Sequence, residues 1–477
     1  MPGSTGAPIN EVPVPAVSPE RFRELLGDRF AELEEATRTA RRLLAGRVIW
    51  HINSTARGGG VAEMLQSLLA YARGAGVDVR WLAIAGNEPF FAVTKRLHNN
   101  LHGSPGDGGE LGPAEEAIYY EGLMPSAMAL AELLRPGDIV YLHDPQPAGL
   151  TRLARDAEVD VIWRCHVGID QPNELVRRAW AFLTPYLEEA NAYVFSRREF
   201  VWDGLDQEKL WIVPPSIDAF SAKNQDLDPI AVKSILATIG LGTDHRPAPV
   251  FQRQDGSLAR VDRRAELTQD GPLPSDAPVI AQVSRWDRLK DPAGVLRCFA
   301  EHCRHPTAHL VLAGPSVVDV ADDPEGADVL AEVEALNASL PEEIRSRTHL
   351  ASLPMDDVEE NAAMVNAIQR RADIVTQKSI AEGFGLTVAE AMWKGRPVIG
   401  SAVGGIRDQI RDGETGLLVE PRDLRGFAEA TLRLLSRPAE AREIGLRARE
   451  EVRDEFLGSR HLGQYSELFD SMLAIAA

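Results

Sequence analysis

The chain has 477 residues, of which 44% are hydrophobic and 26% are charged, and its formal net charge is -20. These proportions are typical of a globular protein, and the length predicts two domains. The negative charge argues against a nucleic-acid partner, because binding a nucleic-acid backbone requires basic patches. It does not exclude a small anion that is held by a few local cations.

The three cysteines, Cys165, Cys298 and Cys303, are an odd number without the spacing of metal ligands. This pattern argues against disulfides and a zinc site, and it fits a reducing compartment. The beginning of the chain shows no basic-then-apolar signal, and no apolar run approaches the roughly 18 residues that suggest a membrane span. We therefore expect a cytoplasmic protein without a membrane partner. The oligomeric state stays open, a homodimer included.

The first half of the chain alternates strand patterns with helix patterns. Residues 1–17 are expected to be irregular, and residues 18–45 are expected to form one helix because apolar residues recur there at helical spacing. A further helix is expected at 61–73. Strands are predicted at 47–52, 77–85, 138–142, 159–165, 192–195 and 210–213. Strands that alternate with helices indicate a parallel, doubly wound sheet.

Pro214 and Pro215 halt the last of these strands, and residues 214–218 are interpreted as a hinge between two domains. The polar stretch 245–276 lacks a clear period, and it includes Gln252-Arg-Gln-Asp-Gly-Ser257, which fits either a hairpin or a loose excursion. A second series follows, with strands predicted at 278–283, 309–313, 348–352, 373–376, 397–400 and 416–419. Helices are predicted from Pro292 and at 229–240, 357–370, 424–435, 438–456 and 461–475. The second half is therefore a second α/β domain.

The segment from Lys378 to Gly400 carries two glutamates, Glu382 and Glu390, separated by seven residues. Gly383 and Gly385 follow the first, and a helix pattern comes next. A helix that begins after glycines offers free N–H groups and a positive dipole end, which suits a phosphate. A carboxylate cap on an ordinary helix explains the glutamates equally well.

Cations and further glycines stand in other predicted loops that follow strands. Arg285 and Lys290 follow the strand at 278–283, and such a pair suits a diphosphate. Gly58, Gly59 and Gly60 follow the first strand, where they permit close approach of a ligand. Two histidines, His143 and His166, also stand at strand ends, where open α/β sheets bind ligands. A solvated loop, or a structural histidine, is the alternative in each case.

Three of these features together resemble glycosyltransferase family 4, whose retaining enzymes use nucleotide-sugar donors: the glycine loop at 58–60, Ser284-Arg285 with Lys290, and Glu382 with Glu390 inside Glu-Gly-Phe-Gly-Leu-Thr-Val-Ala-Glu. Within this family the chain resembles the trehalose glycosyltransferring synthases. The stretches that carry the closer resemblance are Gly58-Gly-Gly-Val-Ala-Glu63, Phe90-Phe-x-Val-Thr-Lys95, His143-Asp-Pro-Gln146, Trp163-Arg-Cys-His166 and Glu390-Ala-Met-Trp-Lys-Gly395. The resemblance covers about residues 46 to 470 but not the stretch 245–276.

The resemblance implies a GT-B fold, with two doubly wound, Rossmann-like domains facing across a cleft. The implied domains are residues 1–214, with 1–45 as an extra arm, and residues 215–457, followed by a final helix at 458–477 that packs back on the first domain. The implied reaction joins glucose from a nucleoside-diphosphate glucose to free glucose, giving α,α-trehalose. Neither a bound metal nor a tightly held cofactor is implied, although the sequence leaves a divalent ion open.

The resemblance also implies roles for individual residues. The catalytic group comprises Arg285, Lys290, Glu382 and His143. The donor-binding group comprises Gly58, Gly59, Gly60, Arg285, Lys290, Gly383, Phe384, Gly385, Leu386, Thr387 and Glu390. The acceptor-binding group comprises Asn87, Glu88, Lys95, His98 and His166. A retaining trehalose phosphorylase, a sugar-nucleotide epimerase and a non-catalytic sugar-nucleotide sensor are the alternatives for the function.

Overall fold

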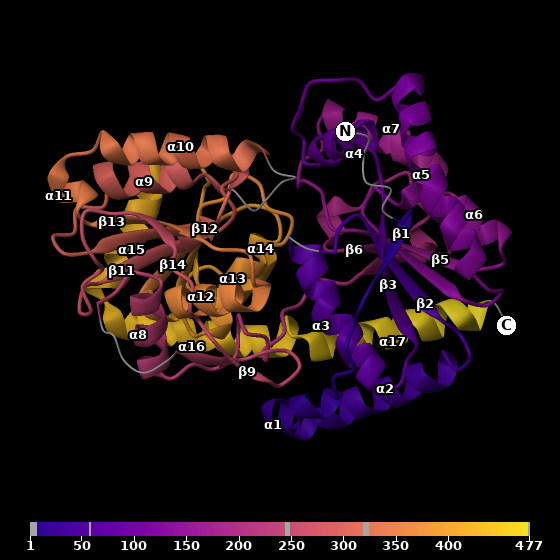
Figure 1. Cartoon of the computed structure of the whole chain (residues 1–477), viewed down its shortest axis with the longest axis horizontal. Coiled ribbons are helices and arrows are strands. Elements are labelled where there is room, and N and C mark those ends of the chain that lie inside the picture. The colour runs from indigo at the N-terminus through magenta and orange to yellow at the C-terminus, as the bar shows by residue number, and fades with distance from the viewer. Residues whose placement is uncertain (1–6, 57–58, 244–248, 318–323, 476–477) are drawn as a thin grey trace. The chain divides into compact units, whose positions relative to one another are not determined.

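The computed structural model describes residues 7–56, 59–243, 249–317 and 324–475. The chain divides into two compact units, residues 1–216 with 458–477, and residues 217–457 (Figure 1). Within the described residues, each unit is built on one seven-stranded sheet, and the second unit has a two-stranded sheet as well.

The sheet of the first unit has the order β1-β3-β2-β4-β5-β6-β7. Its strands are β1 (Ile9–Val12), β2 (Ile49–Asn53), β3 (Val79–Ile84), β4 (Ile139–His143), β5 (Asp160–Cys165), β6 (Ala192–Phe195) and β7 (Leu210–Ile212). All neighbouring pairs are parallel except β1 with β3. The α-helices are α1 (Arg23–Leu26), α2 (Phe30–Leu43), α3 (Gly60–Gly74), α4 (Glu88–Leu101), α5 (Pro113–Leu133), α6 (Thr151–Asp156), α7 (Glu174–Leu187) and α17 (Gly458–Ile475). The predicted parallel, doubly wound sheet is confirmed.

The N-terminal arm differs from the prediction in two ways. Residues 9–12 are not irregular but form β1, which pairs antiparallel with β3 and adds an edge to the sheet. The single helix expected at 18–45 is broken into short turns and α2, because Gly27 takes a φ of 56° that no α-helix contains.

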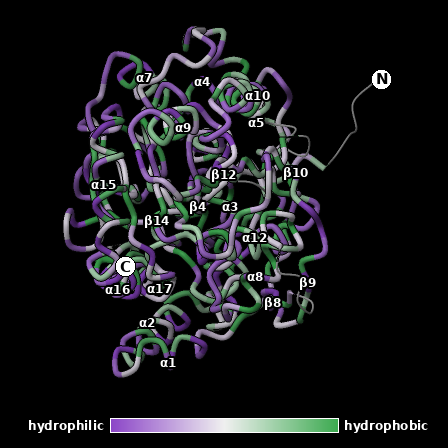
Figure 2. The backbone as a smooth tube through the Cα atoms, turned by 90° about the vertical axis from the view of Figure 1, so that its left-hand side faces the viewer, coloured by the Kyte–Doolittle hydropathy of each residue, from purple (hydrophilic) through white to green (hydrophobic). Residues whose placement is uncertain are grey.

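The sheet of the second unit has the order β10-β13-β12-β11-β14-β15-β16. Its strands are β10 (Glu266–Thr268), β11 (Val279–Val283), β12 (His309–Pro315), β13 (Thr348–Leu353), β14 (Ile374–Gln377), β15 (Val398–Ser401) and β16 (Leu417–Val419). The α-helices are α8 (Pro229–Thr238), α9 (Pro292–Glu301), α10 (Pro324–Ala338), α11 (Glu342–Arg345), α12 (Val358–Arg371), α13 (Leu386–Trp393), α14 (Ile406–Gln409), α15 (Leu424–Ser436) and α16 (Pro438–Glu455). Leu310 and Leu312 of β12 and Ile374 of β14 belong to the hydrophobic core of this unit. Figure 2 colours the backbone by hydropathy, with hydrophobic residues in green.

The described part of the polar stretch 245–276 is a hairpin followed by an edge strand. Strands β8 (Val250–Gln252) and β9 (Leu258–Arg260) pair antiparallel, and β10 joins β13 at the edge of the main sheet. Arg253 holds the hairpin to the start of α12 through ion pairs with Asp357 and Glu359. Of the two interpretations of this stretch, the hairpin is therefore confirmed.

The last helix, α17, packs along α2 in the first unit (Figure 1). The buried Arg164 of β5 donates hydrogen bonds to Nε2 of His461 at 2.8 Å, to the Tyr465 hydroxyl at 2.7 Å and to the Val213 carbonyl at 2.9 Å. Because a guanidinium only donates, Nε2 of His461 accepts, and its Nδ1–H donates to the Ser216 hydroxyl at 2.9 Å. These bonds satisfy polar groups that would otherwise be costly to bury.

None of the helices in the described part of the chain combines the length with the hydropathy that a membrane-spanning helix needs.

Candidate functional site

The second sheet reverses its strand order at β11, which lies between β12 and β14. Both neighbours are parallel to β11, so the loops that leave β11 and β14 emerge side by side at the same edge. Open α/β sheets bind ligands at such a switch point. The loop after β11 carries Arg285 and Lys290, and the loop after β14 carries Glu382.

Lys290 and Glu382 form an ion pair across this edge. The Lys290 ammonium lies 2.7 Å from Oε1 and 2.6 Å from Oε2 of Glu382. The side chains are 17% and 8% exposed, so solvent screens the pair only weakly. The Ser379 hydroxyl donates to Oε2 of Glu382 at 3.0 Å. Two residues that are 92 positions apart are thereby brought together with their charges matched.

Several further bonds connect these two loops. The Gln282 side chain bridges them, donating to the Lys290 carbonyl at 2.9 Å and accepting from the Lys378 N–H at 2.9 Å. Lys378 also pairs with Asp291, which stands in the left-handed region with a φ of 48°. Such a backbone conformation is costly for a residue other than glycine, and strain of this kind is often found at functional sites.

Arg285 differs from Lys290 in its exposure. Its side chain is 49% exposed and lies 3.2 Å from Asp287. An exposed ion pair of this kind contributes little to stability. The guanidinium can therefore turn toward an anion at the switch point without a large loss of folding free energy.

The helix α13 begins directly after the glycine turn, as predicted. Its N-cap residue, Gly385, has a φ of 86°. A second glycine, Gly404, packs closely against this turn. A Cβ at Gly404 would lie 1.7 Å from the Glu382 carbonyl oxygen, so a larger residue does not fit there. Phe384 is buried against Phe456, whereas the next residues along the chain, Leu386 and Thr387, keep partly exposed positions in the first turn.

The second glutamate, Glu390, lies in the second turn of α13 and is 1% exposed. Its Oε1 lies 3.6 Å from the ammonium of Lys223. A carboxylate buried so deeply is costly unless a cation or hydrogen-bond donors accompany it. The alternative interpretation of the glutamates, as caps of an ordinary helix, therefore does not suit Glu390.

The first sheet has its own reversal at β2, which lies between β3 and β4. The glycine loop follows β2, and His143 ends β4. Gly59, with a φ of 81°, is the N-cap of α3, and Gly60 is its first residue. Gly58 lies outside the described residues. The exposed Gly59 and Gly60 leave the first N–H groups of α3 accessible, which suits an anion.

His143 lies within a column of three imidazoles rather than at the surface. It is 1% exposed, and its ring nitrogens lie 3.0 Å from His51 and 3.2 Å from His166. Burial lowers the pKa of His51 to about 3 and holds the pKa values of His143 and His166 well below their usual range. His166, at the partly exposed end of the column, is the member that a ligand can reach.

Asp144 follows His143 and carries backbone strain, with a φ of 66°. Its Oδ1 accepts from the His166 N–H at 2.8 Å, and its own N–H donates to the Arg164 carbonyl at 2.7 Å. Burial raises the pKa of the Asp144 carboxyl to about 7. Asp144 therefore combines a strained backbone with a carboxyl that contacts His166, and it was not among the predicted site residues.

The acceptor candidates of 87–98 lie on or beside α4. Asn87 caps this helix, because its Oδ1 accepts from the Phe90 N–H at 2.9 Å. Glu88, Lys95 and His98 recur at helical spacing, which places them on one side of α4. The Asn173 amide donates to the Gly103 carbonyl at 2.8 Å and so ties the end of α4 to the loop that begins at His166.

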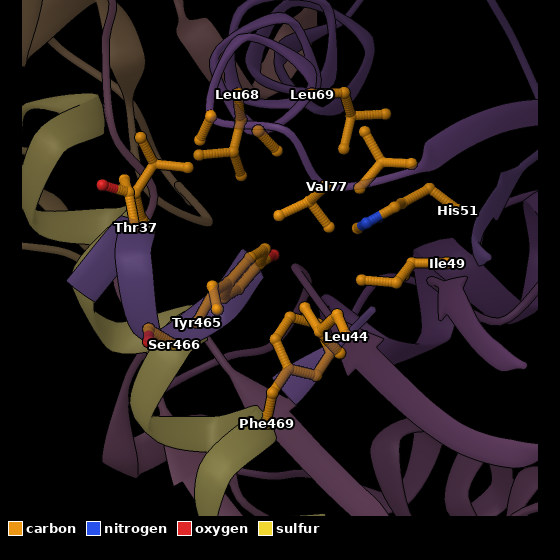
Figure 3. A pocket seen from close by; sticks show the side chains of 15 residues that line it. Thr37, Leu44, Ile49, His51, Leu68, Leu69, Val77, Tyr465, Ser466 and Phe469 are labelled. Atoms are coloured by element: carbon orange, nitrogen blue, oxygen red, sulfur yellow. The ribbon is translucent and has the colours of Figure 1, made fainter. Parts of the chain in front are cut away.

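A separate cavity lies between α2, α3 and α17 (Figure 3). Its volume is about 40 Å³, enough for one or two water molecules but far below the roughly 300–1,000 Å³ of ligand pockets. His51, Tyr465 and Phe469 point toward it together with aliphatic side chains. Since it is too small for a hexose, it is not a candidate substrate site.

No cluster of histidine, cysteine or acidic side chains suited to a metal ion occurs among the described residues. Sequence reasoning missed several residues that contact the predicted site residues. They are Ser379, Gln282, Gly404, His51 and Lys223. One signal in the sequence could have found Gln282, a single polar residue in an otherwise apolar strand. Another is the pair Gly404-Gly405 directly after the strand pattern of β15.

Known proteins resemble the chain over nearly its whole length. A family model described as "Trehalose synthase, N-terminal domain" matches residues 51–202, and one described as "Glycosyl transferases group 1" matches residues 263–451. The trehalose synthase of Rubrobacter xylanophilus is 38% identical over 458 residues, which cover 95% of each chain. That of Thermococcus litoralis is 37% identical over 457 residues, covering 95% of this chain and 96% of the relative.

Solved structures share the fold at much lower identity. An α,α-trehalose-phosphate synthase (UDP-forming) from Burkholderia xenovorans, in complex with glucose-6-phosphate, superposes with a TM-score of 0.66 at 15% identity. The superposition covers 89% of this chain and 100% of that one. Together with the two doubly wound sheets, this likeness confirms the predicted GT-B fold.

Proposed function

Because the chain belongs to the trehalose synthase family, and is thus a trehalose-forming hexosyltransferase, we propose that it transfers glucose from a nucleoside-diphosphate glucose to free glucose with retention of the anomeric configuration. The observation that carries this proposal is the group at the switch point of the second sheet. There Lys290 and Glu382 pair at 2.6 Å, and the half-exposed Arg285 stands on the same loop as Lys290.

Each residue of this group receives a role that its chemistry suits. Arg285 and Lys290 bind the diphosphate, the arginine through its planar fork and the lysine as a point charge. Glu382 accepts hydrogen bonds from hydroxyls of the donor glucose, and it holds the Lys290 ammonium in place. Glu390 binds the ribose. The N–H groups at Gly385 and Leu386, at the start of α13, face the phosphates.

The chemistry then requires little beyond positioning and charge. The bond between the anomeric carbon and the diphosphate oxygen breaks, and negative charge grows on that oxygen. Lys290 and Arg285 stabilise this charge more strongly in the transition state than in the ground state, which lowers the barrier. The acceptor hydroxyl attacks from the same face, its oxygen bonds to the anomeric carbon, and its proton passes to the departing phosphate oxygen.

For the acceptor glucose we propose the polar side of α4 together with His166. Glu88, Lys95 and His98 offer both acceptors and donors for sugar hydroxyls, and His166 is the accessible end of the imidazole column. His143 acts through His166 in this proposal, since both of its ring nitrogens face other histidines.

A product assay tests the proposal. The protein is incubated with glucose and, in separate reactions, ADP-, UDP- and GDP-glucose, and disaccharide and free nucleoside diphosphate are measured. We expect α,α-trehalose and nucleoside diphosphate in equal amounts with at least one donor. The absence of both from every reaction would refute the proposal. Phosphate-dependent release of α-glucose 1-phosphate from trehalose, without activity on nucleotide donors, would instead favour a phosphorylase.

A further inference from the structure

The burial of Glu390 raises the question of how its charge is compensated. The side chain is 1% exposed, and the ammonium of Lys223 lies 3.6 Å from its Oε1. Lys223 belongs to none of the sequence motifs described above. It lies at the start of the second unit, in residues 217–224, which precede α8. Its own side chain is only 18% exposed, so the pair is shielded from bulk water.

The backbone around Lys223 is bound to the same face of α13 that carries Glu390. The Lys394 ammonium bridges the two elements, donating to Oδ1 of Asn224 at 2.9 Å and to the Glu390 carbonyl at 3.1 Å. The Trp393 indole donates to the Asn224 carbonyl at 3.2 Å. From the other side, the Asn366 amide of α12 donates to the Ala222 carbonyl at 3.0 Å.

The turn that leads to Lys223 is also closed internally. The Asn224 amide and the Ser221 hydroxyl both donate to the Asp218 carbonyl, each at 3.0 Å. Because the backbone is held at these points, only the rotamers of the Lys223 side chain remain to be fixed when its ammonium faces Glu390. Lys223 therefore differs from a flexible lysine on the protein surface, because its backbone is fixed beside Glu390.

We propose that Lys223 is a positioning residue that makes the donor site specific for a ribonucleotide. Its ammonium keeps the buried Glu390 ionised and oriented, so that both carboxylate oxygens accept hydrogen bonds from the 2′- and 3′-hydroxyls of the ribose. Hydrogen bonds to an ionised acceptor are about twice as strong as those between neutral groups. Without Lys223, the carboxyl is a buried charge lacking its partner, and it takes up a proton or turns away.

This inference rests on the proposed function in taking a nucleoside diphosphate as the ligand and Glu390 as the residue that binds its ribose, and binding without turnover tests it. The affinities of ADP, UDP and GDP are measured by calorimetry, and the tightest of the three is compared with its 2′,3′-dideoxy analogue. For the unaltered protein we expect the ribonucleotide to bind about tenfold or more tightly than the analogue, since two charge-assisted hydrogen bonds are lost.

In Lys223→Met we expect the ribonucleotide to lose about tenfold in affinity while the dideoxy analogue changes less than about twofold. Lys223→Arg should retain most of the discrimination, because it keeps a cation near Glu390. The matched control is Lys233→Met on the exposed side of α8, which should behave like the unaltered protein. Circular dichroism checks folding, and Lys223→Gln replaces the methionine variant if that one unfolds.

The outcomes separate the inference from the proposed function. An equal loss for both nucleotides in Lys223→Met would overturn the inference, because it would give Lys223 a merely structural role. Equal affinity of the unaltered protein for ribonucleotide and analogue would overturn it too, while leaving the proposed reaction standing. Failure of all three nucleotides to bind the unaltered protein would refute the proposed donor and the inference together.

Discussion

The buried histidines of the first unit make its stability depend on pH. Burial lowers the pKa of His51 to about 3 and holds the pKa values of His143 and His461 well below the usual range. Below pH 6.5 the unfolded chain therefore binds protons that the folded chain refuses, so the free energy of unfolding falls as pH falls. Each imidazole that stays neutral in the fold costs about 2 kcal/mol between pH 8 and pH 5.

Asp144 acts in the opposite direction. Its pKa is raised to about 7, so the folded state takes up a proton on acidification before the unfolded state does, and stability rises by about 2–3 kcal/mol over the same range. Against these three histidines and His166, whose pKa burial also holds well below its usual range, the net loss is about 5–6 kcal/mol. That is a large part of the roughly 5–15 kcal/mol by which a domain is usually stable.

Urea unfolding followed by tryptophan fluorescence measures this loss. Of the eight tryptophans, only Trp286 and Trp393 lie in the second unit, so the signal reports mainly on the first. The variant His51→Asn should lose about 2 kcal/mol less than the unaltered protein between pH 8 and pH 5. His302→Asn, in the second unit, is the matched control. A His51→Asn variant with the pH dependence of the unaltered protein would refute the reasoning.

Two further predictions concern the switch point of the second sheet. Lys290→Ala should lower kcat/KM for trehalose formation by about 100-fold or more, because a cation beside the leaving phosphate is lost. Steady-state kinetics measures this effect, and an unchanged circular dichroism spectrum shows that the variant is folded. Kinetics like those of the unaltered protein would remove Lys290 from the site. Gly404→Ala should destabilise the second unit and impair donor binding, since the added Cβ would lie 1.7 Å from the Glu382 carbonyl oxygen. Gly271→Ala is the control and should do neither, because a Cβ added at Gly271 would have no atom within 4 Å. Thermal unfolding and nucleotide calorimetry measure both effects, and equal behaviour of the two glycine variants would contradict the steric argument.

Local patterns sufficed for most of the strands and for the loops that follow them. Buried parallel strands are short apolar runs that end at polar or glycine-rich loops, a signal that the sequence carries by itself. Arg285, Lys290 and Glu382 could therefore be assigned to the ends of β11 and β14 from the order of residues alone. The helix after Gly385 was predictable in the same way.

Features that depend on distant partners could not be predicted. The segment Ile9–Val12 has too little pattern to be recognised as a strand, and only pairing with β3 makes it one. The break at Gly27 was hidden because the apolar spacing continues past it. His51 is one of two polar residues in β2, and its place in the imidazole column depends on β4 and β5 following β2 in the sheet.

The amino-acid pattern alone determined that this protein is a pair of doubly wound α/β units with cations, glycines and glutamates at strand ends. Only the tertiary structure decided which of these residues meet. The reason is that the order of strands in a sheet sets which loops become neighbours. The hydrophobic pattern of each segment does not predict this order. Lys290 therefore pairs with Glu382, and His143 lies between two other histidines. The cation beside Glu390 is Lys223.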